Sequence, residues 1–202
     1  MILIIQNGYC DTHISKYLNE EIEVVCSFKV NNLDTYIEKI NMYSTVIILG
    51  GHQSTKKLDK NLLSVIQLIR SCVDNRVPLL GICLGCQLIA YVFGCEIKSL
   101  EKMNYGYDTS VLKYTNIFRC HNDYIVPNNM IEIIDIYDSM PYIFKIKSQN
   151  IYGVQCHPDI PPEFVSEFYN NKEIKEFGIK NQSVIDENNK KFMAHILDLL
   201  TN

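Results

Sequence analysis

The amino-acid sequence predicts an α/β fold, with an open, mostly parallel sheet, helices on both faces and a small antiparallel sheet. In the first half of the chain, short apolar runs alternate with segments of helical spacing, which is typical of parallel strands joined by crossover helices. The apolar runs are continuous rather than alternating, so each strand is expected to be buried on both faces. After Gly94 the chain changes to short strands separated by Asn, Asp and Pro, which favours antiparallel pairing.

Strands and helices alternate as far as Gly94. The predicted strands are residues 2–6, 23–28, 45–49 and 77–82. The predicted helices are a short one around 12–18, then 32–43, 59–74 and 84–93. Asp59 is the expected N-cap of the third helix, and Gly94 is the expected stop of the fourth.

The second half of the chain is predicted to be mainly strands, followed by helices. Short antiparallel strands are expected at residues 95–100, 109–113, 117–119, 131–137 and 142–147. A last apolar strand, 151–156, leads into His157, and helices are expected at 161–171 and 186–200. The polar stretch 178–189 is predicted to be a surface loop. The length of 202 residues suits a single domain that spans the whole chain.

Composition excludes several classes of function. The net charge is −4 with no basic stripe, so we expect neither nucleic acid nor an anionic membrane surface as a partner. The first apolar run is too short for a signal peptide, and no run approaches the length of a transmembrane helix. Eight cysteines without a secretion signal favour free thiols in a reducing cytosol, which predicts a cytoplasmic protein.

Cys83 is the candidate nucleophile. It follows an apolar strand and precedes a helix, with Gly81 and Gly85 on either side, which is the cysteine version of a nucleophile elbow. The glycines allow a sharp turn and a close strand–helix approach. The positive end of the helix beneath the sulfur favours the thiolate.

A cysteine nucleophile needs a general base and a group that orients it. Of the five histidines, His157 is expected to have the most rigid backbone, because it follows a buried strand directly and is held by Pro158. Asp159 can turn back onto the imidazole nitrogen that faces away from the sulfur. His52, in a glycine loop, and His121 remain further candidates, whereas His13 and His195 fall within helical patterns.

An oxyanion hole is predicted where Gly50 and Gly51 end a strand. Their backbone N–H groups, paired with that of Leu84, could hold the oxyanion of a tetrahedral intermediate.

Cys83 and Cys86 also form a Cys-x-x-Cys motif, which occurs in thioredoxin-like redox pairs. Such pairs do not need the flanking glycines or a distant His-Pro-Asp, so we disfavour this interpretation. A zinc site is disfavoured too, because no second close Cys/His pair appears.

Four motifs together resemble the class I glutamine amidotransferase domain in its stand-alone, GMP synthase-like form. In the family order they are Leu49-Gly50-Gly51, the stretch from Pro78 to Leu88, Cys120-His121-Asn122-Asp123, and Gly153 to Asp159. The resemblance runs from about residue 44 to residue 168. It implies a flavodoxin-like open sheet and hydrolysis of L-glutamine to glutamate and ammonia, with no cofactor and no metal.

The resemblance also implies roles for particular residues. Cys83 would attack the side-chain amide and form a glutamyl thioester. His157 would move the protons, and Asp159 would orient it. Gly51 and Leu84 would hold the oxyanion. Substrate contacts are expected from Gln87 and from a loop that carries His121, Asn122 and Asp123.

Three positions differ from the family pattern. Asp159 stands where Glu is usual, His52 replaces the proline after the two glycines, and Asn122 replaces a small residue. No glycine-rich ATP-binding loop is visible, so the ammonia is expected to go to a separate synthetase partner or to be released. Two alternatives stay open: a γ-glutamyl peptide hydrolase on the same scaffold, and a binding or regulatory module that has lost activity.

Overall fold

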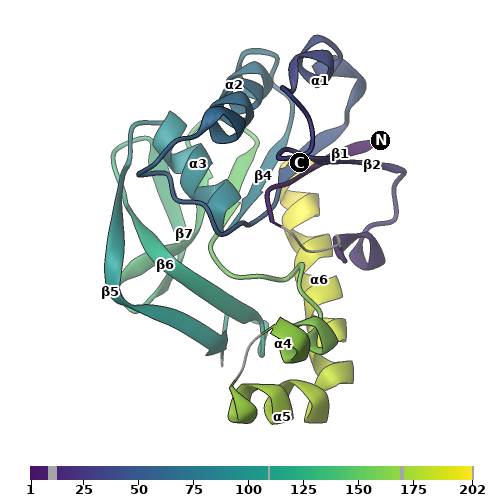
Figure 1. The fold of residues 1–202 in the computed structure, drawn as a ribbon, viewed down its shortest axis with the longest axis vertical. Coiled ribbons are helices and arrows are strands. Elements are labelled where there is room, and N and C mark those ends of the chain that lie inside the picture. The colour runs from purple at the N-terminus through teal and green to yellow at the C-terminus, as the bar shows by residue number, and fades with distance from the viewer. Residues whose placement is uncertain (9–12, 109, 169–170, 202) are drawn as a thin grey trace.

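The computed structural model describes residues 1–8, 13–108, 110–168 and 171–201, and it has the predicted α/β architecture (Figure 1). Its main sheet has seven strands in the order β2-β1-β3-β4-β9-β8-β7. The parallel strands are β1 (Ile2–Gln6), β2 (Ile22–Cys26), β3 (Thr45–Ile48), β4 (Leu79–Ile82) and β9 (Ile151–Val154). At one edge, β8 (Met140–Ile146) and β7 (Ile131–Tyr137) continue the sheet in antiparallel pairing.

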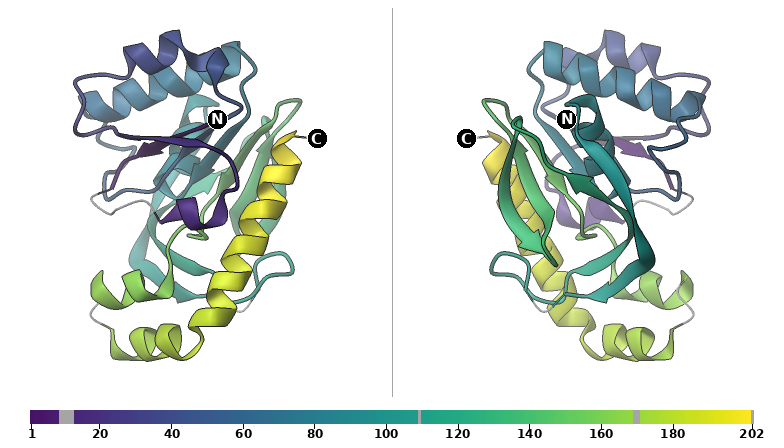
Figure 2. Two further views of the ribbon diagram at one scale, coloured as in Figure 1. Left: turned by 90° about the vertical axis from the view of Figure 1, so that its right-hand side faces the viewer. Right: turned by 90° about the vertical axis from the view of Figure 1, so that its left-hand side faces the viewer.

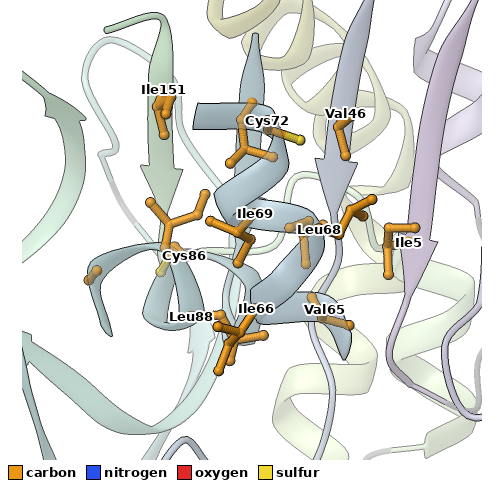
Figure 3. Packing of buried hydrophobic residues seen from close by; sticks show 14 of the residues in the cluster. Ile5, Val46, Val65, Ile66, Leu68, Ile69, Cys72, Cys86, Leu88 and Ile151 are labelled. Carbon is orange, nitrogen blue, oxygen red and sulfur yellow. The ribbon is translucent and has the colours of Figure 1, made fainter. Parts of the chain in front are cut away.

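One face of the sheet is covered by α1 (Asp34–Glu38), α2 (Lys60–Asp74) and α3 (Leu84–Val92). As predicted, Asp59 caps α2, since its Oδ1 accepts a hydrogen bond from the backbone N–H of Leu62 at 2.9 Å. Figure 3 shows the apolar side of α2 packed against the strands and against α3. The α2 side chains in that view are Val65, Ile66, Leu68, Ile69 and Cys72.

The opposite face is covered by η1 (Ile14–Tyr17) and by α6 (Gln182–Thr201), the long helix drawn in yellow in Figure 2. Phe192, Met193 and Ile196 of α6 are fully buried against this side of the sheet. Burying one such side chain stabilises the fold by about 1.5–3 kcal/mol. Two short helices, α4 (Pro162–Phe168) and α5 (Lys172–Lys180), connect β9 to α6.

The small antiparallel sheet pairs β5 (Glu96–Tyr107) with β6 (Phe118–Val126). Both strands are longer than predicted. The outer part of β5, from Asn104 to Tyr107, pairs with residues 118–121 of β6, and this pairing extends both strands. The register shifts between Ser99 and Asn104, where β5 carries a bulge.

Three other predictions were wrong. The stretch 178–189 is the end of α5 and the start of α6 rather than a loop, because Ile185 and Asn189 continue the buried stripe of α6. The predicted strand 109–113 has only one isolated bridge, from Val111 to Tyr114, and residue 109 lies outside the described residues. The helix expected at 32–43 is divided into α1 and η2 (Ile40–Met42).

Across the described residues, no helix has the length and apolar character needed to cross a membrane. The cysteines described, at positions 26, 72, 83, 86, 95, 120 and 156, all carry free thiols, while Cys10 lies outside the described residues.

Candidate active site

Cys83 lies at a sharp turn between β4 and α3. Its φ and ψ angles, 51° and −107°, are rarely adopted by a residue with a side chain, and such backbone strain costs about 1–3 kcal/mol. The turn is held in place because the Cys83 N–H donates to the carbonyl of Val154 at 2.8 Å. Strain of this kind is common at active sites, where the surrounding structure enforces it.

The flanking glycines allow the strand and the helix to touch. A Cβ on Gly81 would lie 2.5 Å from the carbonyl oxygen of Gly85. A Cβ on Gly85 would lie 2.0 Å from the carbonyl oxygen of Ile48 in β3. Any side chain at either position would therefore push α3 away from the sheet and move Cys83.

His157 lies beside Cys83 at the end of β9. Its backbone N–H donates to the carbonyl of Phe118 at 2.7 Å, which ties the end of β9 to β6. Its Nδ1 lies 3.1 Å from Oδ1 of Asp159, and Cys83 lies near enough to the ring for its negative charge to raise the pKa of His157. A Cβ on Gly50 would lie 2.8 Å from His157 Cε1 and 3.3 Å from Cys83 Cβ, so the ring, the cysteine and the glycine loop meet at one point.

The electrostatics favour a charged imidazole. Burial lowers the pKa of His157, but the negative charge of Cys83, the carboxylate of Asp159 and the hydrogen bonds to both outweigh it. The net result is a pKa of His157 well above its usual range. The arrangement therefore places a charged imidazolium beside the Cys83 sulfur, which is a setting in which a cysteine can act as a nucleophile.

These residues open into a cavity of about 600 Å³. Its wall brings together every residue for which we predicted a role at the site. They are Cys83, His157, Asp159, Gly51, Leu84, Gln87, His121, Asn122 and Asp123. A Cβ on Gly51 would lie 3.0 Å from Cδ2 of Leu84, so the two residues proposed for the oxyanion hole are in contact.

His121, Asn122 and Asp123 lie on strand β6, not on a loop as predicted. Nδ1 of His121 lies 3.1 Å from the carbonyl oxygen of Asp123, which can only accept, so Nδ1 carries the proton. Nε2 is then an acceptor, 3.5 Å from the side-chain nitrogen of Asn104. Both ring nitrogens of His121 are thus bonded within the protein.

Comparisons with known proteins identify the family to which this chain belongs. The model of the family "Glutamine amidotransferase class-I" matches residues 9–180. This chain belongs to that family. A putative glutamine amidotransferase-like protein of Acanthamoeba polyphaga mimivirus is 48% identical over 202 residues, which cover 99% of this chain and 97% of the relative.

Two further similarities agree with this assignment. A glutamine-hydrolyzing GMP synthase subunit of Methanosphaera stadtmanae is 34% identical over 177 residues, covering 79% of this chain and 88% of the relative. The crystal structure of a glutamine amidotransferase from Methylobacillus flagellatus superposes with a TM-score of 0.81 at 18% identity, covering 98% of this chain and 94% of that one. That likeness concerns the fold.

Some residues of this candidate site had no signal in the sequence. The carboxylate of Asp123 accepts hydrogen bonds from Ser54 at 2.7 Å and from Ser99 at 2.6 Å. The side-chain nitrogen of Gln87 donates to the carbonyl of Asp123 at 3.2 Å and to Oε1 of Gln155 at 3.3 Å. Ser99 and Gln155 lie inside predicted strands, and only the folded structure places them at the site.

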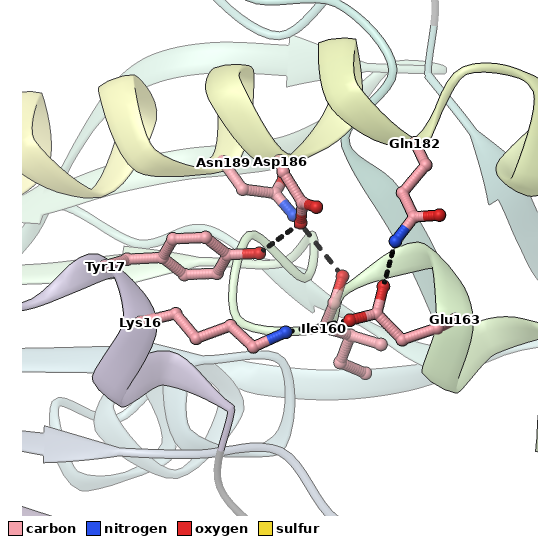
Figure 4. A network of polar contacts seen from close by, with 7 residues as sticks. All are labelled: Lys16, Tyr17, Ile160, Glu163, Gln182, Asp186 and Asn189. Atoms are coloured by element: carbon pink, nitrogen blue, oxygen red, sulfur yellow. Dashed lines mark hydrogen bonds and ion pairs between the residues drawn. The ribbon is translucent and has the colours of Figure 1, made fainter.

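A polar network fixes the loop that follows Asp159 (Figure 4). Asn189 of α6, fully buried, donates to the carbonyl of Ile160 at 3.3 Å. Next to it, the Tyr17 hydroxyl donates to Asp186 at 2.9 Å. Glu163 accepts from both Lys16 and Gln182. The network joins η1, α4 and α6 directly behind the loop that carries His157 and Asp159.

We expect His121 to make the stability of this protein depend on pH. Burial, aided by the charges of His157 and Arg119, lowers the pKa of His121 from 6.5 to about 4. Between these values the unfolded chain binds more protons than the folded one, so stability falls as the pH drops from 6.5 toward 4, by about 3 kcal/mol in all.

Urea unfolding at pH 7 and pH 5 measures this effect. The variant His121→Asn keeps an amide nitrogen near the place of Nδ1 but cannot titrate, so it is expected to lose less stability over this interval than the wild type. An equal loss in both proteins would contradict the assignment of the effect to His121.

Proposed function

We propose that this chain hydrolyses the side-chain amide of L-glutamine to glutamate and ammonia. One observation carries the proposal: Cys83, at a strained elbow at the N-terminus of α3, shares a cavity with the buried His157–Asp159 pair, and its negative charge raises the pKa of His157. A nucleophile, a base and a group that orients the base are the parts that cysteine amide hydrolysis needs. Membership of the amidotransferase family supports glutamine as the amide.

The first half of the reaction forms a thioester. The Cys83 thiolate attacks the amide carbon, and the N–H groups of Gly51 and Leu84 stabilise the resulting oxyanion. Since Nδ1 of His157 faces Asp159, its Nε2 faces the sulfur and delivers a proton to the leaving nitrogen. The carbon–nitrogen bond breaks, ammonia leaves, and a γ-glutamyl thioester remains on Cys83.

The second half regenerates the enzyme. His157, now neutral, takes a proton from a water molecule, and the hydroxide attacks the thioester carbon. The carbon–sulfur bond breaks and glutamate leaves, while Cys83 returns to the thiolate and His157 to the imidazolium. Asp159 keeps the ring oriented in both halves, and its shorter side chain still reaches Nδ1 at 3.1 Å.

We further propose that the ammonia passes to a separate synthetase of the GMP synthase type, in the cytoplasm. The similarity to the GMP synthase subunit of Methanosphaera stadtmanae supports this acceptor. Stimulation of ammonia release by a synthetase added in trans would then be expected.

Ammonia release from L-glutamine by the purified, reduced protein tests the proposal, with γ-glutamyl dipeptides as competing substrates. We expect kcat/KM to be higher for glutamine. A clear preference for the dipeptides would instead identify a γ-glutamyl peptide hydrolase. No turnover of either, with and without a synthetase, would point to the inactive binding module.

A further inference from the structure

The residue that follows strand β1 holds the glycine loop at the end of β3. Asn7 comes directly after β1 and is fully buried. Its side-chain nitrogen donates to the carbonyl of Leu49 at 3.0 Å, and its side-chain oxygen accepts from the hydroxyl of Ser27 at 2.8 Å. The Leu49 carbonyl can only accept, so it fixes which end of the amide faces β3. Asn7 thereby joins the ends of β1, β2 and β3.

The far side of the glycine loop is held by the same residue. Gln53 lies just beyond the loop segment 50–52, and its side-chain nitrogen donates to the backbone carbonyl of Asn7 at 3.0 Å. The segment is therefore tied to Asn7 at both ends, through Leu49 on one side and Gln53 on the other. It belongs to no helix or strand, so its position depends on side-chain bonds of this kind.

Gly51 packs directly against these anchors. A Cβ on Gly51 would lie 2.4 Å from Oε1 of Gln53 and 3.0 Å from the carbonyl oxygen of Asn7. Within the described part of the chain, Oε1 of Gln53 is buried and accepts no hydrogen bond, although buried polar atoms are normally paired. The Gln53 amide is therefore placed by its Nε2 bond to Asn7 and by its contact with Gly51, and its oxygen stays unsatisfied.

The position of this loop matters because Gly51 is one of the two proposed oxyanion donors. The other donor, Leu84, is the first residue of α3 and is fixed by the helix. A donor has to lie about 2.7–3.1 Å from the oxyanion, and a displacement of about 1 Å can cost about 10²-fold in rate. Cys83 follows a different strand, β4, so a shift of the loop would weaken oxyanion binding while the sulfur stays in place.

We propose that Asn7 and Gln53 are positioning residues that hold the Gly51 N–H against the oxyanion formed when Cys83 attacks an acyl carbon. They act through Gly51, so they lower the barrier to acylation and leave substrate binding and the reactivity of the sulfur unchanged. The proposal rests on the proposed function for the roles of Cys83 and Gly51.

Two reagents separate this role from a general effect on the site. p-Nitrophenyl acetate acylates a thiolate through a tetrahedral oxyanion: the sulfur–carbon bond forms, the carbon–oxygen bond of the ester breaks, and p-nitrophenolate leaves. Iodoacetamide alkylates the same sulfur by displacing iodide from a saturated carbon, so no oxyanion forms. Initial release of p-nitrophenolate measures acylation, after subtraction of the rate in Cys83→Ala protein. Mass spectrometry of the Cys83 peptide measures alkylation.

Gln53→Met keeps a side chain of similar length but removes the donor to Asn7. We expect this variant to slow acylation at least about 10-fold, because the Gly51 N–H is displaced. Alkylation should stay within about twofold of the wild type, and kcat for glutamine should fall while KM stays within about twofold. Gln67→Met is the matched control, because Gln67 is exposed on α2, and it should match the wild type in every value.

Asn7→Ala is a second, independent variant. It should also slow acylation and spare alkylation, because the bond to Leu49 is lost. Its Tm should be lower than that of Gln53→Met protein, since both side-chain hydrogen bonds of a buried amide are removed.

Acylation of Gln53→Met protein at the wild-type rate would overturn the proposal. So would equal slowing of acylation and alkylation, because that pattern belongs to a residue that supports the Cys83 elbow as a whole. A raised KM with an unchanged kcat would also overturn it, since Gln53 would then be a substrate contact. Selectively slowed acylation in Gln53→Met protein, together with no ammonia release by the wild type, would leave this inference standing and refute the proposed hydrolysis of glutamine alone.

Discussion

Replacing Cys83 by Ala is expected to lower ammonia release from glutamine by at least about 10³-fold. Without the sulfur there is no nucleophile, and only substrate binding and the oxyanion-hole N–H groups of Gly51 and Leu84 remain. His157 also loses the negative charge that, together with Asp159, holds its pKa high against the effect of burial. Initial rates of glutamate and ammonia formation measure the change.

Cys72→Ala is the matched control for this variant. Cys72 is a fully buried thiol on α2, and it packs in the core rather than at the cavity. The Cys72→Ala protein should release ammonia at a rate close to that of the wild type, once the fraction of folded protein is taken into account. A Cys83→Ala protein that retained a substantial part of the wild-type rate would show that the reaction does not pass through this sulfur.

Replacing Gly85 by Ala is expected to be among the most destabilising single changes in the chain. The added Cβ would lie 2.0 Å from the carbonyl oxygen of Ile48 and 2.8 Å from its carbonyl carbon. Both are backbone atoms, so no side-chain rotation relieves the clash, and α3 must move away from β3. We expect a loss of about 3 kcal/mol or more in the free energy of unfolding, measured by urea denaturation.

Gly8→Ala is the control for the change from glycine to alanine. At Gly8 the added Cβ would meet the Gly50 oxygen at 3.5 Å and Gly51 Cα at 3.9 Å, which are ordinary contacts. The free energy of unfolding of Gly8→Ala protein should therefore stay within about 1 kcal/mol of the wild-type value. A Gly85→Ala protein as stable as Gly8→Ala would refute the close packing of the elbow.

The parallel part of the fold could be predicted because each strand there is a continuous apolar run with its own local signal. The outer end of β5 lacks one, since residues such as Asn104 and Gly106 become a strand by pairing with His121 and Arg119 across the small sheet. The start of α6 could not be predicted for a similar reason. Its polar residues are typical of a loop, and only the folded structure shows that Ile185 and Asn189 belong to a buried stripe. The division into domains stays a prediction.

For the site, the sequence could indicate residues that follow buried strands. Cys83 and His157 each stand directly after an apolar run, and their meeting in the cavity follows from adjacent parallel strands β4 and β9. The contacts of Asp123 could not be predicted, because Ser54 comes from a loop and Ser99 is brought opposite Asp123 only by the register of β5 on β6. The orientation of His121 also depends on Asn104, whose position is set by the bulge in β5.

Labelling with a glutamine-like electrophile such as 6-diazo-5-oxo-L-norleucine tests the central claim most directly, because it needs no synthetase partner. After incubation of the reduced protein, intact-mass measurement and peptide mapping locate the adduct. We predict a single adduct on Cys83 that excess L-glutamine prevents, and a much slower reaction in His157→Ala protein. An adduct on another cysteine, or no adduct while the Cys83 thiol is reduced, would contradict the proposed function.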